Sequence, residues 1–548
     1  MTVSITFLGG LGEIGRNCSV LEVGGRLALI DCGLMFPEED MLGVDLVLPD
    51  FTSVLERAGD VECIVLTHAH EDHVGALGYF LSSLAVPVYG TSLTVEMARS
   101  RIEEAGIKAD LRPVAAGEWR EHGPFRFSLI PVSHSIPQGT GIAFDTPEGL
   151  VVHSGDFKLD PTPIDGLPTD LPEFAALGRR GVRLLLADST NAELPGFVPS
   201  ESSLGQPLYE LVVESRGRLI VACFSSHLHR IQQVVDAAVD AGRYVAFLGR
   251  SMQRNVATGE ALGVIAIPPD AVIPLEEVLD LAPERTAIVC TGSQGEPFSA
   301  LSLMANGDHH WVTIEQGDTV VMSARAIPGN ETRVSRVIND LTRLGARVFH
   351  EHNATVHVSG HGAQEELKTF LNVVRPRAFV PIHGEYRHLK AHADLAREMK
   401  VPEVFVCQDG DRITLDGEET RVEVGAVPAG HVFVEGVEVA GDTGTIRDRR
   451  HLRDNGVIIV TVVLDGRTGA IVQGPFLDSH GFMRDPALVL ARAGTEVAAE
   501  VRALPAGPPD LETVRRHMVA AVRRVTREAK SRRTKARKTV VIPIVLEM

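Results

Sequence analysis

The chain has few cysteines, and no two of them are spaced to share a metal ion. Its 548 residues include six cysteines, and no Cys-x-x-Cys motif occurs. They stand singly, several in apolar segments such as LIVACF and AIVCTG: Cys18, Cys32, Cys63, Cys223, Cys290 and Cys407. This spacing argues against a disulfide framework and against a zinc site built from thiolates. We expect buried free thiols in a reducing, cytoplasmic environment.

Long apolar runs are also missing. No run approaches the roughly 18–20 residues that span a bilayer. The first residues, MTVSITFLGG, lack the basic and apolar regions of a secretory signal. We therefore expect no membrane partner. Hydrophobic residues make up 44% of the chain and charged residues 23%, which is typical of a globular protein. A chain of this length is expected to form about two to four domains.

Positive charge is scarce overall but concentrated near the C-terminus. The net charge of −19, taken alone, argues against a polyanionic partner. Between Arg515 and Lys538, however, eleven Lys and Arg residues stand with one acid, Glu528, which gives a local charge of +10. This stretch is either a solvated helix face or a surface that attracts phosphates, and the sequence leaves both readings open. Metal ions at a catalytic site would add positive charge that this count omits.

Two patterns of secondary structure follow one another along the chain. From Ile5 to Ile30 short apolar segments alternate with Gly-rich turns, and further short strands continue to Asp188. From about Leu194 fully apolar segments, such as RLIVACF and TVVMSAR, alternate with helical stretches. This second pattern predicts βαβ units with a mostly parallel sheet. The segment near 425–450 is rich in Gly, Val and Asp, and NGVIIVTVVLD then begins a small C-terminal α/β unit.

One short stretch concentrates residues that bind metals. VLTHAHEDHVGALG places His68, His70, Asp72 and His73 within six residues, on a predicted loop that follows an apolar strand. Alternate side chains of an extended turn point the same way, so His68 and His70 can face one ion while Asp72 and His73 face a second. Imidazole and carboxylate ligands suit zinc or manganese. The alternative is four unrelated polar residues in a solvated loop.

Three further candidate ligands stand in suitable contexts downstream. They are His134 in VSHSIPQGTG, Asp156 in HSGDFK and His383 in VPIHGE. Each would be weak evidence alone, because lone histidines usually have structural roles. Together with the four-ligand stretch they predict a site for two metal ions, which such sites hold about 3.5–4 Å apart.

These motifs carry a resemblance to a known family. HAHEDH, SHSIP, GDFK, ADST, HVSGHG and IHGE together resemble the metallo-β-lactamase superfamily, in its β-CASP branch of nucleic-acid-processing enzymes. With FLGGLGEIGRN near the start and the C-terminal unit, the chain is similar over essentially its whole length to the bacterial ribonuclease J family. The resemblance implies a ribonuclease that degrades and matures single-stranded RNA with two divalent ions, zinc or manganese or both.

The resemblance also implies roles for individual residues. The ligands would form two sets bridged by Asp156: His68, His70 and His134 in one, and Asp72, His73 and His383 in the other. Water activated by the ions would attack the phosphorus, and a His361–Asp188 pair would protonate the leaving 3′-oxygen. The reading in which Asp188 only orients His361 stays open.

Two segments are candidates for a phosphate pocket. In this family the HVSGH block binds substrate, and here it comprises His357, Val358, Ser359, Gly360 and His361. Small residues would let its backbone N–H groups approach a phosphate. FSSH, with Ser225, Ser226 and His227, is the second candidate, and its alternative is an ordinary strand-to-helix turn with an N-cap serine. A pocket at a fixed distance from the metals would anchor a 5′-monophosphate, so we expect 5′-to-3′ exonuclease activity with a secondary endonuclease mode.

Three weaker expectations concern other residues. Glu331 of the IPGNE stretch and the nearby Arg333 are further candidates for the substrate cleft. Asn17 of GRNCSV is expected to brace the metal site rather than bind substrate. Some relatives bind an additional divalent ion, for which the candidate ligands in this chain are Gly43, Asp45 and Asp442.

The architecture implied by the resemblance is an α/β fold in three parts. A metallo-β-lactamase αββα sandwich would comprise residues 1–193 and 355–430, with an inserted β-CASP α/β domain at 194–354. A linker at 431–450 would lead to a small C-terminal α/β domain at 451–548. The active site would lie in the cleft between the first two domains, which admits a single strand and excludes a duplex. The C-terminal domain would help to form a homodimer or tetramer, and membership of an RNA-decay complex stays open.

Other functions fit parts of the pattern. A small-molecule hydrolase of the same superfamily would share the HxHxDH stretch, but the inserted domain and HVSGHG argue against it. A DNA nuclease of the same branch would typically lack the equivalent of His383, which is present here. A non-catalytic RNA-binding scaffold is disfavoured because every expected metal ligand is present.

Overall fold

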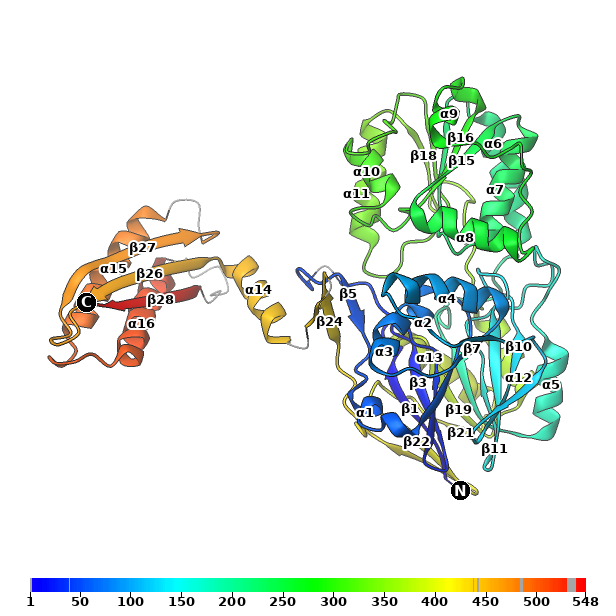
Figure 1. Ribbon diagram of the computed structural model, residues 1–548, viewed down its shortest axis with the longest axis horizontal. Coiled ribbons are helices and arrows are strands. Elements are labelled where there is room, and N and C mark those ends of the chain that lie inside the picture. The colour runs from blue at the N-terminus through cyan, green and yellow to red at the C-terminus, as the bar shows by residue number, and fades with distance from the viewer. Residues whose placement is uncertain (1, 39, 437, 441–442, 483–485, 530–538) are drawn as a thin grey trace. The chain divides into compact units, whose positions relative to one another are not determined.

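The computed structural model describes residues 2–38, 40–436, 438–440, 443–482, 486–529 and 539–548 (Figure 1). The chain forms two compact units. The first comprises residues 1–38 and 45–439, and the second comprises residues 39–44 and 440–548.

Two β-sheets packed face to face form the centre of the first unit. The larger sheet contains, in spatial order, β23 (Glu419–Glu423), β22 (Arg412–Asp416), β1 (Val3–Gly9), β3 (Cys18–Val23), β4 (Arg26–Ile30), β6 (Val61–Val65), β7 (Val88–Gly90) and β8 (Leu111–Pro113). The smaller sheet contains β21 (Glu403–Val404), β19 (Ala378–Ile382), β13 (Val182–Asp188), β12 (Gly149–His153), β11 (Thr140–Thr146), β10 (Phe125–Pro131) and β9 (Trp119–His122). Alternate residues of a strand face opposite sides, so Ile5 and Phe7 of β1 pack with Phe127 and Phe144 of the other sheet, while Leu8 faces the opposite side.

Helices cover the outer faces of both sheets. The larger sheet is covered by α1 (Thr52–Leu55), α3 (Leu77–Ser83) and α4 (Ser92–Glu104), and the smaller sheet by α5 (Leu171–Arg180), α12 (Gln364–Val374) and α13 (Tyr386–Glu398). The predicted αββα sandwich is confirmed (Figure 1). It is assembled from both ends of the unit, because Val3 of β1 pairs with Leu415 of β22.

A separate five-stranded sheet forms the domain inserted into the sandwich. Its spatial order is β15 (Tyr244–Leu248), β16 (Thr286–Cys290), β14 (Leu219–Ala222), β17 (Thr319–Met322) and β18 (Arg347–Phe349). All of its strand pairs are parallel, as the βαβ pattern predicts. One face packs on α7 (Leu228–Asp240) and α8 (Arg250–Ala261), and the other on α10 (Ala300–Asn306) and α11 (Glu331–Arg343). Burial of both faces explains why the strands are apolar throughout.

The apolar core of the inserted domain extends into the sandwich. The cluster that contains Leu228 and Ile231 of α7 also includes Ala69, Ile136 and Val358. Ala69 stands between His68 and His70. The inserted domain therefore packs directly on the segment that carries the candidate metal ligands.

The second unit is built on a three-stranded sheet. β26 (Val457–Leu464) lies between β27 (Ile471–His480) and β28 (Val540–Glu547), and its buried residues pack on α15 (Ala487–Arg502) and α16 (Leu511–Ala529). This is the expected small C-terminal α/β unit. The segment predicted as a linker contains β24 (Val432–Glu435), which pairs with β5 (Leu46–Leu48) of the first unit. It also contains the first part of α14 (Thr443–Asn455) of the second unit.

The basic stretch near the C-terminus lies partly on α16. There Arg524 pairs with Glu496 and Glu500 of α15, at 3.1 and 2.6 Å. The described part of the stretch thus contributes to contacts between the two helices. The remaining basic residues lie outside the described residues: Lys530, Arg532, Arg533, Lys535, Arg537 and Lys538.

The structure also bears on the cysteines and on membrane-spanning helices. All six cysteines are free and buried, as predicted. Among the described residues, no helix combines the length and the apolar character needed to cross a membrane.

Candidate metal centre

The ligand-rich stretch follows the C-terminal end of β6, which lies between β4 and β7 in the larger sheet. His68 and His70 lie on a loop, whereas Asp72 and His73 lie in a one-turn helix, α2 (Glu71–Val74), which differs from the predicted loop. The backbone at Gly33 packs so closely on α2 that an added Cβ would lie 1.6 Å from the Asp72 carbonyl oxygen. Only glycine is tolerated at this position. The segment after β4 therefore holds the short helix in place.

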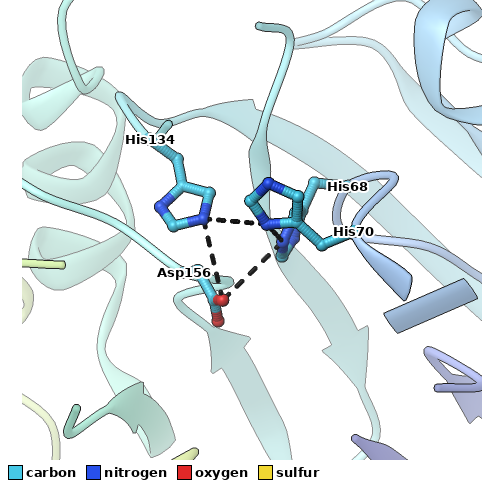
Figure 2. Close-up of side chains that lie close together, drawn as sticks. All are labelled: His68, His70, His134 and Asp156. Atoms are coloured by element: carbon cyan, nitrogen blue, oxygen red, sulfur yellow. Dashed lines mark hydrogen bonds and ion pairs between the residues drawn. The ribbon is translucent and has the colours of Figure 1, made fainter. Parts of the chain in front are cut away.

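Seven predicted ligands come together in two sets that share Asp156. The sets are His68, His70, His134 and Asp156, and Asp72, His73, His383 and Asp156. Within each set the ligand atoms lie within 4.8 Å of one another. Figure 2 shows the first set, with the Asp156 carboxylate directed toward the imidazoles.

A single oxygen of Asp156 faces both sets. Its Oδ2 lies 3.6 Å from His68 Nε2, 3.2 Å from His73 Nε2 and 3.3 Å from His383 Nε2. An oxygen this close to the ligands of both sets is in a position to bind both ions as a bridging ligand.

The chemistry of this cluster fits divalent cations. Nitrogen atoms of three imidazoles converge, since His70 Nδ1 lies 3.0 Å from His68 Nε2 and 3.2 Å from His134 Nε2. Burial lowers the pKa of His70 to about 4 and holds the pKa values of His68 and His134 well below the usual range. Neutral imidazoles with converging lone pairs are the state that binds a metal ion. The ligand set of imidazole and carboxylate is that of zinc or manganese.

Three hydrogen bonds from outside the cluster orient its imidazoles. His73 Nδ1 lies 2.8 Å from Asp31 Oδ2, His134 Nδ1 lies 2.8 Å from the Gly360 carbonyl oxygen, and His383 Nδ1 lies 2.9 Å from Asn17 Oδ1. Each contact occupies Nδ1 and leaves Nε2 to face the cluster. Asn17 Nδ2 also donates to Asp72 Oδ2 at 3.2 Å, so Asn17 touches two ligands of one set in the way that a brace would.

Sequence reasoning missed Asp31. It lies at the end of β4, is 1% exposed, and accepts hydrogen bonds from the backbone N–H and the hydroxyl of Thr67, both at 2.8 Å. Its φ of 60° and that of His383, 53°, place both backbones in the left-handed region, which is costly for residues other than glycine. The available signal was an acidic residue ending the apolar segment RLALID beside the ligand-bearing strand.

Replacing Asp31 with asparagine is expected to weaken ion binding by about 10- to 100-fold. An amide has one acceptor oxygen, so either the Thr67 N–H or the His73 ring loses its acceptor, and the ring can then turn its protonated nitrogen toward the cluster. Metal content measured against graded concentrations of a competing chelator would test this. Asp60→Asn, at an exposed ion pair with Arg57, is the matched control. Equal metal retention in both variants would contradict the orienting role.

The predicted acid–base pair lies beside both sets. His361 Nδ1 lies 2.7 Å from Asp188 Oδ2, and the His361 ring stacks on that of His383 with centroids 5.4 Å apart. Burial opposes protonation of His361, but the Asp188 carboxylate outweighs it and raises the pKa of His361 to about 9. Asp188 is itself held by the Thr190 N–H at 2.9 Å. A protonated His361 with its Nδ1 engaged has Nε2–H as the proton that it can donate.

The HVSGH block packs against the first ligand set but differs in detail from the predicted cradle. The His361 N–H is directed to Ser359 Oγ at 3.2 Å, so this N–H is not free for a phosphate. Gly360 is required by the close packing, because an added Cβ would lie 2.8 Å from His134 Nδ1. Val358 belongs to the apolar cluster. His357 Nδ1 is buried and has no hydrogen-bond partner among the described residues.

The FSSH turn lies close to both the ligand stretch and the HVSGH block. Burial, Arg230 and His227 together lower the pKa of His357 to about 3, and His227 is also among the nearby charges that affect the pKa of His70. The N-cap of α7 is His227, without a side-chain cap, and not a serine as the alternative reading expected. Ser225 Oγ accepts a hydrogen bond from Asn255 at 3.2 Å, and Ser226 is half-buried.

The weaker candidates have structural contacts of their own. Glu331 Oε2 accepts the Gly329 N–H at 2.8 Å at the start of α11, and the Arg333 backbone packs against Gly295. Of the candidates for an additional ion, Asp45 Oδ2 accepts the Gly436 N–H at 2.7 Å. Gly43 lies in the second unit, and Asp442 lies outside the described residues.

Family comparisons cover most of the chain. The metallo-beta-lactamase superfamily matches residues 11–190, the ribonuclease J beta-CASP domain 216–341, the Zn-dependent metallo-hydrolase RNA specificity domain 349–407 and the ribonuclease J C-terminal domain 444–548. Ribonuclease J of Mycobacterium tuberculosis (strain ATCC 25618 / H37Rv) is 44% identical over 504 residues, which are 91% of this chain and 90% of the relative.

More distant relatives extend the similarity to the full length. Ribonuclease J of Mycolicibacterium smegmatis is 41% identical over 99% of this chain and 97% of the relative. Ribonuclease J2 of Bacillus subtilis (strain 168) is 38% identical over 100% of this chain and 99% of the relative. Among solved structures, a protein of unknown function from Enterococcus faecalis V583 aligns with a TM-score of 0.53 at 17% identity. It covers 76% of this chain and 100% of that chain, which shows a similar fold alone.

Proposed function

We propose that this chain, which belongs to the ribonuclease J family and is a metal-dependent ribonuclease, hydrolyses single-stranded RNA with two divalent ions. The observation that carries the two-ion proposal is the convergence of seven His and Asp side chains in two sets that share Asp156. Zinc and manganese both accept these ligands, and manganese, the harder ion, better tolerates phosphate oxygen.

Two ions held by these residues would supply Lewis acidity to a water molecule and to the phosphoryl oxygens. The protein supplies the remaining chemistry. His361 donates its Nε2 proton to the leaving 3′-oxygen, because Asp188 holds Nδ1 and keeps the ring protonated near neutral pH. Asp31 and Asn17 keep Nε2 of His73 and His383 directed inward throughout the reaction.

The position of the phosphate-pocket candidates supports cleavage from an anchored 5′ end. His357 Nδ1 is a buried nitrogen without a partner among the described residues, and such an atom is costly unless a ligand or water satisfies it. His227 of the FSSH turn is close enough to influence the pKa of both His357 and His70. A terminal monophosphate bound here fixes the first phosphodiester relative to the ions, which yields 5′-to-3′ release of nucleotides. A triphosphate would overfill the pocket.

Rates on one unstructured RNA carrying a 5′-monophosphate, a 5′-hydroxyl or a 5′-triphosphate test this proposal. We expect the monophosphate to be degraded about 10- to 100-fold faster than the other two, the value of one charge-assisted hydrogen bond. Each form is assayed with zinc and with manganese, and the RNA is labelled at each end in turn. Equal rates for all three ends, or mononucleotides released first from the 3′ end, would refute the anchored mode and leave the metal chemistry standing.

A further inference from the structure

A fully buried arginine connects the two segments that join the inserted domain to the sandwich. Arg230 of α7 is 0% exposed. The outgoing segment follows β13 and contains η2 (Glu201–Leu204), and the returning segment follows β18 and contains Val356. Arg230 Nε donates to Glu201 Oε1 at 2.8 Å, and its Nη1 donates to the Val356 carbonyl oxygen at 2.9 Å. One side chain thus binds both crossings between the domains.

Each crossing is also fixed on its far side. Ser323, which follows β17, donates its hydroxyl to the Val356 carbonyl oxygen at 2.7 Å, and Arg230 Nη1 contacts Ser323 as well. On the other side, the Glu201 N–H donates to Asp160 Oδ2 at 3.0 Å. Asp160 stands four residues after the shared ligand Asp156. A series of contacts therefore runs from Asp160, four residues after the shared ligand, through Glu201 and Arg230 to Ser323 at the end of β17.

The same arginine lies next to both halves of the proposed phosphate pocket. Val356 directly precedes His357 of the HVSGH block, and Arg230 lies one helical turn after His227 of the FSSH turn. The Glu201 carboxylate that binds Arg230 also lies 3.3 Å from His227 Nε2. Moving Arg230 would move the two halves of the pocket relative to each other.

An ion pair buried this deeply is not required for stability in general. Apolar side chains of similar volume often replace such pairs without loss, because desolvation offsets the attraction between the charges. The directional hydrogen bonds of the planar guanidinium are what an apolar side chain, or a lysine, cannot reproduce. The contribution specific to Arg230 is therefore geometric.

We infer that Arg230 is a positioning residue that sets the distance between the phosphate pocket and the metal centre, and so determines the end preference of cleavage. This inference rests on the proposed function and extends it. Arg230 does not touch the reacting atoms. It acts through the two crossings, and its loss should affect anchored RNA while leaving cleavage of unanchored RNA nearly unchanged.

The test compares three variants of the full chain. Arg230→Met combined with Glu201→Gln removes both buried charges at similar volume. Arg230→Lys keeps the charge without the planar fork. Arg243→Met removes a second buried arginine of the inserted domain that donates to the Gly217 and Thr286 carbonyl oxygens, at 2.9 and 3.1 Å, away from both crossings. It controls for general loosening of the domain.

The double variant should lower the preference for 5′-monophosphate over 5′-hydroxyl RNA by about 10-fold or more, through KM for the monophosphate form. Its kcat on 5′-hydroxyl RNA should stay within a few-fold of the wild type. Arg230→Lys should lose most of the preference and Arg243→Met should keep it. If the double variant keeps the full preference for 5′-monophosphate RNA, Arg230 is not a positioning residue. If Arg230→Lys keeps the full preference, the charge alone is sufficient and the positioning role is likewise overturned.

Hydrogen exchange of the backbone separates this inference from the proposed function. In the double variant, amides of residues 201–204 and 354–357 should exchange faster than in Arg243→Met. If the wild type shows no preference between RNA 5′ ends, the anchored mode of the proposed function fails. The rate of hydrogen exchange at residues 201–204 and 354–357 then shows separately whether Arg230 holds the two crossings together. Equal exchange in the two variants would overturn the inference by itself.

Discussion

Asp72→Ala is expected to abolish RNA hydrolysis while the fold persists. Asp72 contributes to only one of the two ligand sets, and its side chain is 28% exposed, so its removal leaves no buried cavity or unpaired charge. The loss of one ion forfeits several kcal/mol of transition-state stabilisation, which corresponds to a decrease in kcat of at least about 10³-fold. Turnover of 5′-labelled RNA measures the loss of activity, and thermal melting measures whether the fold persists. Elemental analysis of the purified protein measures the loss of the ion.

The matched control is Glu121→Gln, which removes a carboxylate that is 76% exposed and pairs with Arg126 at 3.6 Å rather than with a candidate ligand. It should retain both activity and metal content. The wild type should lose activity to a chelator and regain it with zinc or manganese. The two-ion mechanism is wrong if the wild-type protein keeps its full turnover in excess chelator. It is also wrong if metal-depleted Asp72→Ala protein hydrolyses RNA at the wild-type rate.

The structure makes His73 a poorer choice for this experiment than the sequence suggests. From the sequence alone, both Asp72 and His73 are expected to be replaceable without damage to the fold, because both are predicted on a loop. In the structure His73 is 1% exposed and pairs with the buried Asp31 at 2.8 Å. Its removal would leave the buried Asp31 carboxylate with only its hydrogen bonds from Thr67, and the loss of one partner of a buried pair is usually destabilising.

His361→Ala is expected to lower turnover by roughly 10²–10⁴-fold, the usual contribution of a positioned general acid. Both metal ions should be retained, since His361 is not in either set that shares Asp156. Asp188→Asn should act in the same direction, because it removes the charge that raises the pKa of His361. If the two residues act as a unit, the double variant should be little worse than His361→Ala alone.

A substrate with a better leaving group distinguishes proton donation from a structural role. An activated aryl phosphodiester expels a phenolate that needs no proton, so the defect of His361→Ala should shrink to less than about 10-fold on this substrate. His480→Ala, at a side chain that is 74% exposed in the second unit, is the control and should behave as the wild type. A defect of the same size on both substrates would mean that His361 does not donate the proton.

Much of the candidate site could be predicted because its ligands stand in local sequence patterns. Four of them share one stretch of six residues, and His134, Asp156 and His383 each follow an apolar strand in a recognisable context. Strand ends that meet at one edge of a sheet bring such residues together. The layered fold was predictable for the same reason, since short strands and βαβ units have distinct hydrophobic patterns.

The residues that orient the ligands could not be predicted in this way. Asp31 acts on His73 only because β4 and β6 are neighbours in the sheet, and no motif in the 41 residues between Asp31 and His73 predicts this contact. Arg230 lies in an ordinary amphipathic helix, and its contacts with Glu201 and Val356 arise from tertiary packing. The Ser359 hydroxyl that takes up the His361 N–H likewise depends on side-chain geometry rather than on sequence spacing.

The divided sandwich has a consequence for how the enzyme is made. Six of the seven candidate ligands lie before residue 160, but His383 arrives only after the whole inserted domain, and β1 gains its neighbour β22 later still. Domains generally fold as units while the chain is synthesised from its N-terminus. A nascent chain emerging from the ribosome therefore cannot complete the second ligand set until most of the protein has been translated. The synthesis order keeps an RNA-cutting centre unfinished during the period in which it is tethered to a particle made largely of RNA.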